Sequence, residues 1–250
     1  MRLGGWWGAV GDLLLGAQCP GCDAPGWGLC PACREDVSGP GYLTRPDPCP
    51  VGFPVTATAG PYGSTMKRLV SAHKEHQVLT LTPVLAGRLA VAVEHLLSAG
   101  PRLPPAASVV LVPVPSSPAA VRARGLDATW AMARGAARRC RPSGVVGAAR
   151  LLTLARRIQD QAGLGAAERR ENLRESLRAA GRGLGPGCVA LIVDDVVTTG
   201  SSLTEARRAL RAARIPVLGA ATVAATVRSR SGSPPDERRG EAARETEGRR

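Results

Sequence analysis

Residues 189–203, VALIVDDVVTTGSSL, decide the fold of this chain. The run 189–193 is continuous, apolar and rich in β-branched residues, and it is too short for a buried helix, so it predicts a buried parallel strand. Asp194 and Asp195 follow the run directly. Open α/β sheets bind their ligands at the carboxyl ends of their strands, so the pair of aspartates marks a candidate site.

A short turn rich in hydroxyl groups follows the aspartates and leads into a helix that we expect to begin near Leu203. Backbone N–H groups in such a turn, at a helix N-terminus, form a cradle for an anion. Gly200 lets the backbone approach a ligand without a Cβ in the way. The carboxylates can accept hydrogen bonds from a diol or hold a cation. A phosphate beside a sugar diol describes a ribose 5-phosphate. The turn consists of Thr198, Thr199, Gly200, Ser201 and Ser202.

The segment resembles the phosphoribosyl-pyrophosphate (PRPP) motif of type I phosphoribosyltransferases. The resemblance implies that Asp194 and Asp195 meet the ribose hydroxyls and are the candidate catalytic residues, and that residues 198–202 hold the 5-phosphate. The alternative is a receiver-type fold, in which paired aspartates at a strand end hold a metal ion. That alternative leaves the TTGSS turn without an explanation.

Four cysteines near the start form two C-x-x-C pairs, Cys19 with Cys22 and Cys30 with Cys33. Four thiolates at this spacing can close a tetrahedral zinc site. The segment 18–38 is too short and too poor in apolar residues for a core of its own, so metal binding would supply its folding energy. Disulfides would need an oxidising compartment, and redox chemistry would need only one C-x-x-C pair. We therefore predict a small structural zinc module with four cysteine ligands that resembles a zinc ribbon.

The segment 1–17 carries apolar residues such as Trp6 and Leu14 on one helical face, which predicts a short amphipathic helix packed on the zinc module. A lipoprotein signal ending at Cys19 is the alternative, but Asp12 interrupts the apolar run and positive charge is scarce. The chain has no run of eighteen apolar residues, so we expect no membrane span and a cytoplasmic location.

The 250-residue chain carries a net charge of +13. The segment 229–250 holds six Arg against five acidic residues, which leaves +12 on the rest of the chain, and its polar composition predicts disorder. A body this basic attracts phosphates or nucleic acid with strong salt dependence. A solvated basic surface without a dedicated partner explains the charge nearly as well. Aromatic residues for base stacking are few, so any binding to single-stranded DNA is expected to tolerate all sequences.

Strand and helix patterns alternate between residues 55 and 228, which predicts an α/β domain with a doubly wound parallel sheet. The segment 39–54 is rich in Pro and Gly and predicts a linker with little regular structure. The expected helices span 64–73, 79–97, 126–139 and 203–213, and the expected strands span 55–59, 109–114, 144–152, 189–193 and 217–226.

The order of these pieces resembles the ComF family of phosphoribosyltransferase-like proteins. The resemblance rests on the two cysteine pairs, YGSTMKRLVSAHKEH (62–76), VVLVPVPSSPAAVRARG (109–125), RRIQDQAGLGAAERRENL (156–173) and the PRPP motif. It implies a zinc-ribbon-like module joined to a PRPP-binding domain of the type I phosphoribosyltransferase kind, with Mg²⁺ accompanying PRPP. It also implies a role in handling incoming single-stranded DNA in transformable bacteria, with competence-machinery proteins as partners.

Three basic residues join the predicted PRPP site through this resemblance. Lys74 matches the basic position after the first helix of the domain, where a compact ammonium suits a pyrophosphate oxygen, although a surface lysine is an equal interpretation. Arg124 matches the arginine of the family's Arg-Gly pair, and Arg157 belongs to the polar loop that closes over the reacting centre in this fold. The family's next residues usually read Phe-Asn-Gln, whereas residues 126–128 read Leu-Asp-Ala here.

Two functions remain open on the sequence. The first is a PRPP- or phosphosugar-binding protein that handles DNA during competence or repair. The alternative is an active, Mg²⁺-dependent phosphoribosyltransferase of nucleotide metabolism with an unknown acceptor. The sequence supplies no obvious general base, because we expect Glu205, the first carboxylate after the PRPP motif, on the solvent side of its helix.

Overall fold

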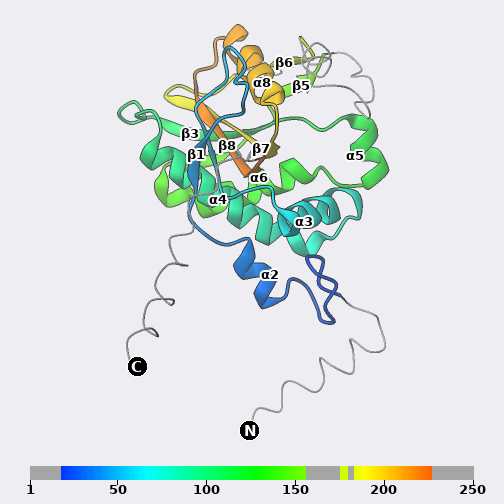
Figure 1. The fold of residues 1–250 in the computed structure, drawn as a ribbon. Helices are drawn as coiled ribbons and strands as arrows, with labels where there is room; N and C mark the ends of the chain where they lie inside the picture. The colour runs from blue at the N-terminus through cyan, green and yellow to red at the C-terminus, as the bar shows by residue number, and fades with distance from the viewer. Residues whose placement is uncertain (1–17, 156–174, 180–182, 227–250) are drawn as a thin grey trace, which may run out of the picture.

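A six-stranded, mostly parallel sheet forms the centre of this mixed α/β protein (Figure 1). The computed structural model describes residues 18–155, 175–179 and 183–226. The strands lie in the order β1-β2-β8-β7-β3-β4, and all neighbours are parallel except β1 and β2. Their bounds are Tyr42–Thr44 for β1, Thr56–Thr58 for β2, Ser108–Pro113 for β3, Val145–Ala148 for β4, Cys188–Val197 for β7 and Val217–Ala225 for β8.

The central strand β7 is buried on both faces, as its run of Val, Leu and Ile predicts. It pairs with β3 on one side and with β8 on the other. The strand is longer than the expected 189–193, because pairing with β8 continues past the two aspartates to Val197. Asp194 and Asp195 therefore lie within the paired part of the strand, near its carboxyl end, rather than in the loop after it.

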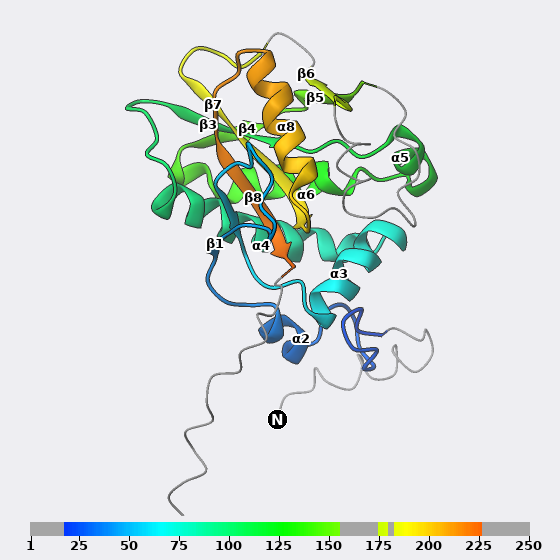
Figure 2. The ribbon, with the colours of Figure 1, turned by 45° about the horizontal axis from the view of Figure 1, so that its top comes forward.

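Helices cover both faces of this sheet (Figure 2). α4 (Thr82–Ala99) and α6 (Ala128–Arg139) pack on one face together with α3 (Ser64–Glu75), and α8 (Ser201–Ala212) packs on the other. The shorter helices are α2 (Pro31–Asp36), α5 (Pro118–Arg124) and the 3₁₀ turns Leu79–Leu81 and Arg141–Ser143. Layers of helices on a parallel sheet are the arrangement that the alternating patterns predict.

Two apolar clusters fill the space between the layers. Leu191 and Val193 of β7 belong to the cluster on the α4 side, and Ile192 belongs to the cluster on the α8 side. Alternate side chains of the strand thus point to opposite faces. Small residues let the helices approach closely: a Cβ on Gly135 of α6 would lie 2.6 Å from the Cβ of Ala86 of α4.

Among the described residues, one helical segment, Leu79–Ala99, is long and apolar enough to cross a membrane. In this structure it includes α4, whose residues Leu85, Leu89 and Val93 are buried against the sheet and α6. The segment therefore packs as a core helix of this domain.

Two expected regions differ from the structure. The segment 39–54 was expected to have little regular structure, but it contains β1, which adds an antiparallel strand to the edge of the sheet. The expected strand 144–152 is divided between β4 and β5 (Leu152–Leu154), which pairs with β6 (Leu177–Ala179) in a separate two-stranded sheet. The predicted helix in 1–17, the tail 229–250 and Arg157 lie outside the described residues.

Candidate functional site

Lys74 and Asp195 form an ion pair at the carboxyl end of β7. Lys74 lies in the last turn of α3, and its Nζ is 2.6 Å from Oδ2 of Asp195. The side chains are 26% and 10% exposed, so water only partly screens the pair. The neighbouring carboxyl of Asp194 accepts a hydrogen bond through Oδ1 from the Asp195 backbone N–H at 2.9 Å. The structure thus brings together three of the residues that the sequence predicted for one site.

The two carboxyl groups have different acidities. Burial, followed by the Asp195 charge, raises the pKa of Asp194 well above its usual value. Burial also opposes ionisation of Asp195, but the Lys74 ammonium outweighs it and lowers the pKa of Asp195. Burial alone would lower the pKa of Lys74, and the charges of Asp195 and Asp194 raise it. The site therefore holds one ionised carboxylate with a lysine counter-ion and one carboxyl that protonates readily.

The turn between β7 and α8 presents backbone N–H groups beside these carboxyls. Gly200 is the N-cap of α8 in a left-handed conformation, with φ 75°, and no side chain caps the helix. The first N–H groups of a helix have no partner inside the helix, so this N-terminus can accept an anion. The hydroxyls of Thr199 and Ser201 form a hydrogen bond with each other at 3.0 Å, which leaves one of the two O–H groups to donate to a ligand.

The space beside Gly200 is occupied by protein. A Cβ at this position would lie 2.7 Å from the Phe53 ring and 2.9 Å from Pro46. We expected Gly200 to leave room for a ligand, and the structure shows that the glycine instead admits the 45–54 loop. The same loop accepts a hydrogen bond at the Gly52 carbonyl from Arg207 of α8 at 2.8 Å. The loop therefore forms a wall along the first turns of α8.

Arg124 and Arg157 are the other two basic residues that the sequence predicted for the site. Arg124 lies at the end of α5 and forms an ion pair with Glu75, with 3.3 Å between its Nη2 and Oε1 of Glu75. Glu75 follows Lys74 directly in α3. Its charge is close enough to oppose protonation of Lys74. Arg124 therefore lies beside the Lys74–Asp195 pair but is held by Glu75. Arg157 lies outside the described residues.

Asp127, which differs from the family's pattern, has a structural role at the start of α6. Its Oδ1 accepts a hydrogen bond from the Trp130 backbone N–H at 3.1 Å, and its Oδ2 pairs with Arg150 at 3.1 Å. The Arg150 guanidinium in turn lies 4.5 Å from the centre of the Trp130 ring. The Asp127 carboxylate occupies one of the first N–H groups of α6, and its negative charge disfavours an external anion at this helix N-terminus.

Glu205 is buried, and the expectation of a solvent-facing carboxylate was wrong. Its Oε1 accepts a hydrogen bond from the Leu177 backbone N–H of β6 at 3.1 Å. Both oxygens also accept hydrogen bonds from Arg208 at 2.7 Å. The helical period of α8 does not predict the burial of Glu205, because the strand that covers this face of α8, β6, comes from a distant part of the chain. Glu205 joins α8 to the two-stranded sheet.

Tyr62 is a further residue beside the carboxyls that the sequence did not single out for the site. Burial, followed by the Asp195 charge, raises its pKa. Its backbone N–H donates to the Ala225 carbonyl at 2.7 Å, which fixes the residue at the same end of the sheet as Asp195.

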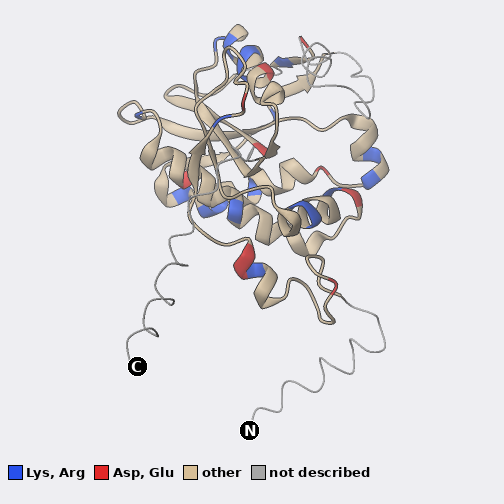
Figure 3. Ribbon diagram, in the orientation of Figure 1, with Lys and Arg blue, Asp and Glu red and all other residues tan. Residues whose placement is uncertain are grey.

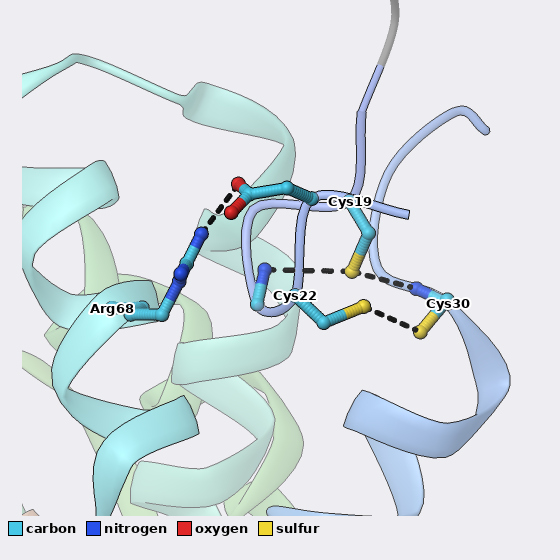
Figure 4. Close-up of polar contacts among 6 residues, drawn as sticks. Cys19, Cys22, Cys30 and Arg68 are labelled. Carbon is cyan, nitrogen blue, oxygen red and sulfur yellow. Dashed lines mark hydrogen bonds and ion pairs between the residues drawn. The ribbon is translucent and has the colours of Figure 1, made fainter. Parts of the chain in front are cut away.

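The four N-terminal cysteines form a compact cluster, of which Figure 4 shows Cys19, Cys22 and Cys30. Their sulfur atoms all lie within 4.8 Å of one another, and none of the seven cysteines is in a disulfide. The backbone N–H groups of Cys30 and Gly21 donate to Sγ of Cys19 at 3.3 and 3.4 Å. Burial opposes ionisation of Cys19, but these donors lower its pKa to about 6. The cluster is compatible with a structural zinc ion.

The cysteine module is attached to the rest of the protein by packing and by charge. Cys33, Leu29 and Val37 belong to the same apolar cluster as the residues of α3 and α4. Asp23 forms an exposed ion pair with Arg68 of α3 (Figure 4). Solvent screens an exposed pair of this kind, so the buried residues account for most of the attachment.

Basic residues are spread over α3, α5, α6 and α8 rather than gathered on one element (Figure 3).

No family model matches the chain, and the curated proteins contain no match to it.

Proposed function

We propose that this protein binds a phosphorylated ribose, PRPP or a related compound, at the carboxyl edge of β7. The observation that carries the proposal is the placement of Asp194, Asp195 and Lys74 at the end of β7, which leads through residues 198–200 into an α8 N-terminus without a side-chain cap. The helix N-terminus suits the phosphate, and the carboxylates suit the ribose hydroxyls or a Mg²⁺ ion. Lys74 suits a pyrophosphate oxygen.

Isothermal titration calorimetry with ribose 5-phosphate, with and without Mg²⁺, tests this proposal. We expect binding to the wild type and a loss of at least about tenfold in affinity for Asp194→Asn with Asp195→Asn, because hydrogen bonds to charged groups are lost. Asp36→Asn, which removes an acidic group on α2, serves as the matched control and should bind like the wild type. Ribose without its phosphate should bind more weakly. The proposal fails if the wild type binds neither ribose 5-phosphate nor PRPP.

We further propose that the protein is ComF-like, has the type I phosphoribosyltransferase fold and handles DNA during competence or repair in the cytoplasm. Support comes from the order of the sequence pieces and from the strand–turn–helix that carries the PRPP motif. The distributed basic residues favour sequence-tolerant contact with single-stranded DNA. Fluorescence anisotropy with oligonucleotides of unrelated sequence should give equal affinities that fall steeply as salt rises. Equal affinity at low and high salt would contradict this role.

An active phosphoribosyltransferase is the second candidate, favoured by the basic groups beside the carboxyls. Lys74, paired with Asp195, and Arg124, paired with Glu75, would supply cations for a departing pyrophosphate, and Mg²⁺ would supply further charge. Pyrophosphate release from PRPP and Mg²⁺, measured across a panel of nitrogen nucleophiles, tests it. Turnover that Lys74→Met abolishes would establish the enzyme, and no turnover with any acceptor would leave binding as the function.

We propose that the cysteine cluster holds one structural zinc ion. Elemental analysis of the purified protein should give about one zinc per chain, with Cys33→Ser reducing the zinc content and the melting temperature. Cys49→Ser is the matched control, because Cys49 is exposed and outside the cluster. Equal zinc content in the wild type and in Cys33→Ser would refute this assignment.

A further inference from the structure

Thr222 of β8 is a buried polar residue without a visible role in the fold. Its side chain is 0% exposed, and its Oγ1 has no hydrogen-bond partner among the residues that the structure describes. A buried hydroxyl usually finds a partner, because leaving one unpaired costs about 1–3 kcal/mol. Valine has nearly the same shape as threonine and would remove this penalty. The position therefore calls for a reason to keep the hydroxyl.

The sheet register places Thr222 directly opposite Asp194. The parallel pairing of β7 and β8 aligns Asp194 with Thr222, and the pairing of β2 and β8 aligns Thr222 with Thr58. Ala221 and Val223 belong to the apolar cluster on the α4 side, so Thr222 between them points to the α8 face. Side chains at aligned positions leave neighbouring strands on the same face. Thr58, Thr222 and Asp194 thus form a polar row across three strands, on the face that carries the α8 N-terminus.

The members of this row differ in their partners. Thr58 donates to the Gly60 carbonyl at 3.3 Å, so its hydroxyl is accounted for by the local turn. The Asp194 carboxyl accepts a hydrogen bond through Oδ1 from the Asp195 backbone N–H, and a side-chain hydrogen bond also joins it to Asp195. In the next aligned row on the same face, Ile192 and Ala220 are apolar, and Thr56 donates to the Pro54 carbonyl at 2.9 Å. In these two rows the unpaired hydroxyl therefore belongs to the residue that is aligned with Asp194.

We propose that Thr222 is a positioning residue of the phosphosugar site, whose hydroxyl donates to the Asp194 carboxylate when that carboxylate engages the ribose or its cation. The inference rests on the proposed function. Thr222 acts through Asp194, because a residue with no exposed surface does not itself meet the ligand. The hydrogen bond fixes one carboxylate oxygen and leaves the other free for the ribose.

The test compares Thr222→Val, Thr222→Ser and Thr58→Val in the full chain, with ribose 5-phosphate as the probe in calorimetry and urea unfolding as the measure of stability. Thr222→Val should fold at least as stably as the wild type, because a methyl replaces an unpaired hydroxyl. It should bind ribose 5-phosphate about tenfold more weakly, the size expected for a lost hydrogen bond to a charged group. Thr222→Ser should restore the affinity. Thr58→Val should lose stability and keep its affinity.

The outcomes separate this inference from the proposed function. If the wild type and Thr222→Val bind ribose 5-phosphate equally, the role of Thr222 is refuted and the site stands. If Thr222→Val and Thr58→Val lose affinity and stability alike, Thr222 is structural and the inference is also refuted. If Thr222→Val does not fold, Thr222→Ala takes its place and the same comparison with Thr222→Ser decides. If the wild type does not bind, the proposed function fails, and this inference fails with it.

Discussion

Replacing Lys74 by methionine tests the electrostatics of the candidate site in isolation from any ligand. Methionine keeps most of the aliphatic side chain and removes the ammonium that lies 2.6 Å from Asp195 Oδ2. Removing one partner of a buried ion pair costs about 3–5 kcal/mol, because the other charge stays buried and uncompensated. Lys74 is 26% exposed, so water recovers part of the loss and we expect the lower end, about 3 kcal/mol. For a domain of this size that is a fall of about 6–12 °C in melting temperature.

The pH dependence follows from the directions of the pKa shifts. In the wild type the lowered pKa of Asp195 contributes stability above its unfolded value of about 3.9, and this is lost as pH falls through the folded pKa. In Lys74→Met the buried carboxyl has no ammonium beside it, so its folded pKa rises above the unfolded value. The penalty is then present at neutral pH and disappears on acidification, when the carboxyl is protonated in both states. The stability gap between the two proteins should therefore narrow from pH 7 to pH 4.

Urea unfolding at pH 7 and pH 4 measures this gap, and a double variant provides the control. Lys74→Met with Asp195→Asn removes both charges and should recover most of the stability that Lys74→Met alone loses, because no buried charge is left unpaired. A variant as stable as the wild type at pH 7 would show that the pair is not formed in solution. A gap of equal size at both pH values would show that the loss comes from packing and not from the charge.

Three further substitutions test the elements around the site, each by urea unfolding at pH 7. Gly200→Ala strains a left-handed φ and drives a Cβ into the Phe53 ring, so we expect the free energy of unfolding to fall by about 2–5 kcal/mol. In the control Gly144→Ala the Cβ meets open space, so the fall should be only about 1–3 kcal/mol. Equal losses in the two variants would refute the Phe53 contact. Glu205→Gln keeps an acceptor for the β6 backbone and weakens only a half-exposed ion pair, so the stability should fall by about 1 kcal/mol. Glu205→Leu leaves the buried Leu177 N–H unpaired, so its loss of stability should be at least twice as large. Asp127→Ala removes the α6 cap and should lower the stability by about 1 kcal/mol. Asp127→Ser restores a capping hydroxyl and should recover most of this loss. If serine does not recover it, the loss belongs to the ion pair with Arg150 instead.

Local patterns predicted the elements that local interactions form. The expected strand and helix on either side of the Thr198–Ser202 turn appear as β7 and α8, because an apolar run and a helical period each depend on nearby residues. The expected helix 126–139 begins two residues later in the structure, since Asp127 caps it from outside. The cysteine cluster was equally accessible to prediction, because two C-x-x-C pairs separated by a short segment leave few ways to arrange four sulfurs.

Contacts between distant segments account for what the sequence did not predict. Glu205 was expected in solvent because its burial depends on β6, a strand 28 residues away along the chain. The environment of Gly200 depends on Phe53, and nothing near either residue indicates that the 45–54 loop lies against α8. The sequence left open whether Lys74 is a surface residue or a site residue, because only the packing of α3 against the sheet brings it to Asp195. Side-chain partners of this kind need the fold before they can be named.

The carboxyl edge of β7 groups features that lower stability, and this grouping supports a binding site independently of any sequence motif. Asp194 is a carboxyl that burial pushes toward protonation, and Thr222, which is aligned with it in the sheet, has an unpaired hydroxyl among the described residues. Elsewhere β7 and β8 are filled mostly with Val, Ala, Leu and Ile. A fold selected for stability alone gains nothing from placing two such groups side by side. A ligand whose hydroxyls or cation engage Asp194 would favour the ionised carboxylate and so give the Thr222 hydroxyl an acceptor, and the stability lost locally would be regained on binding.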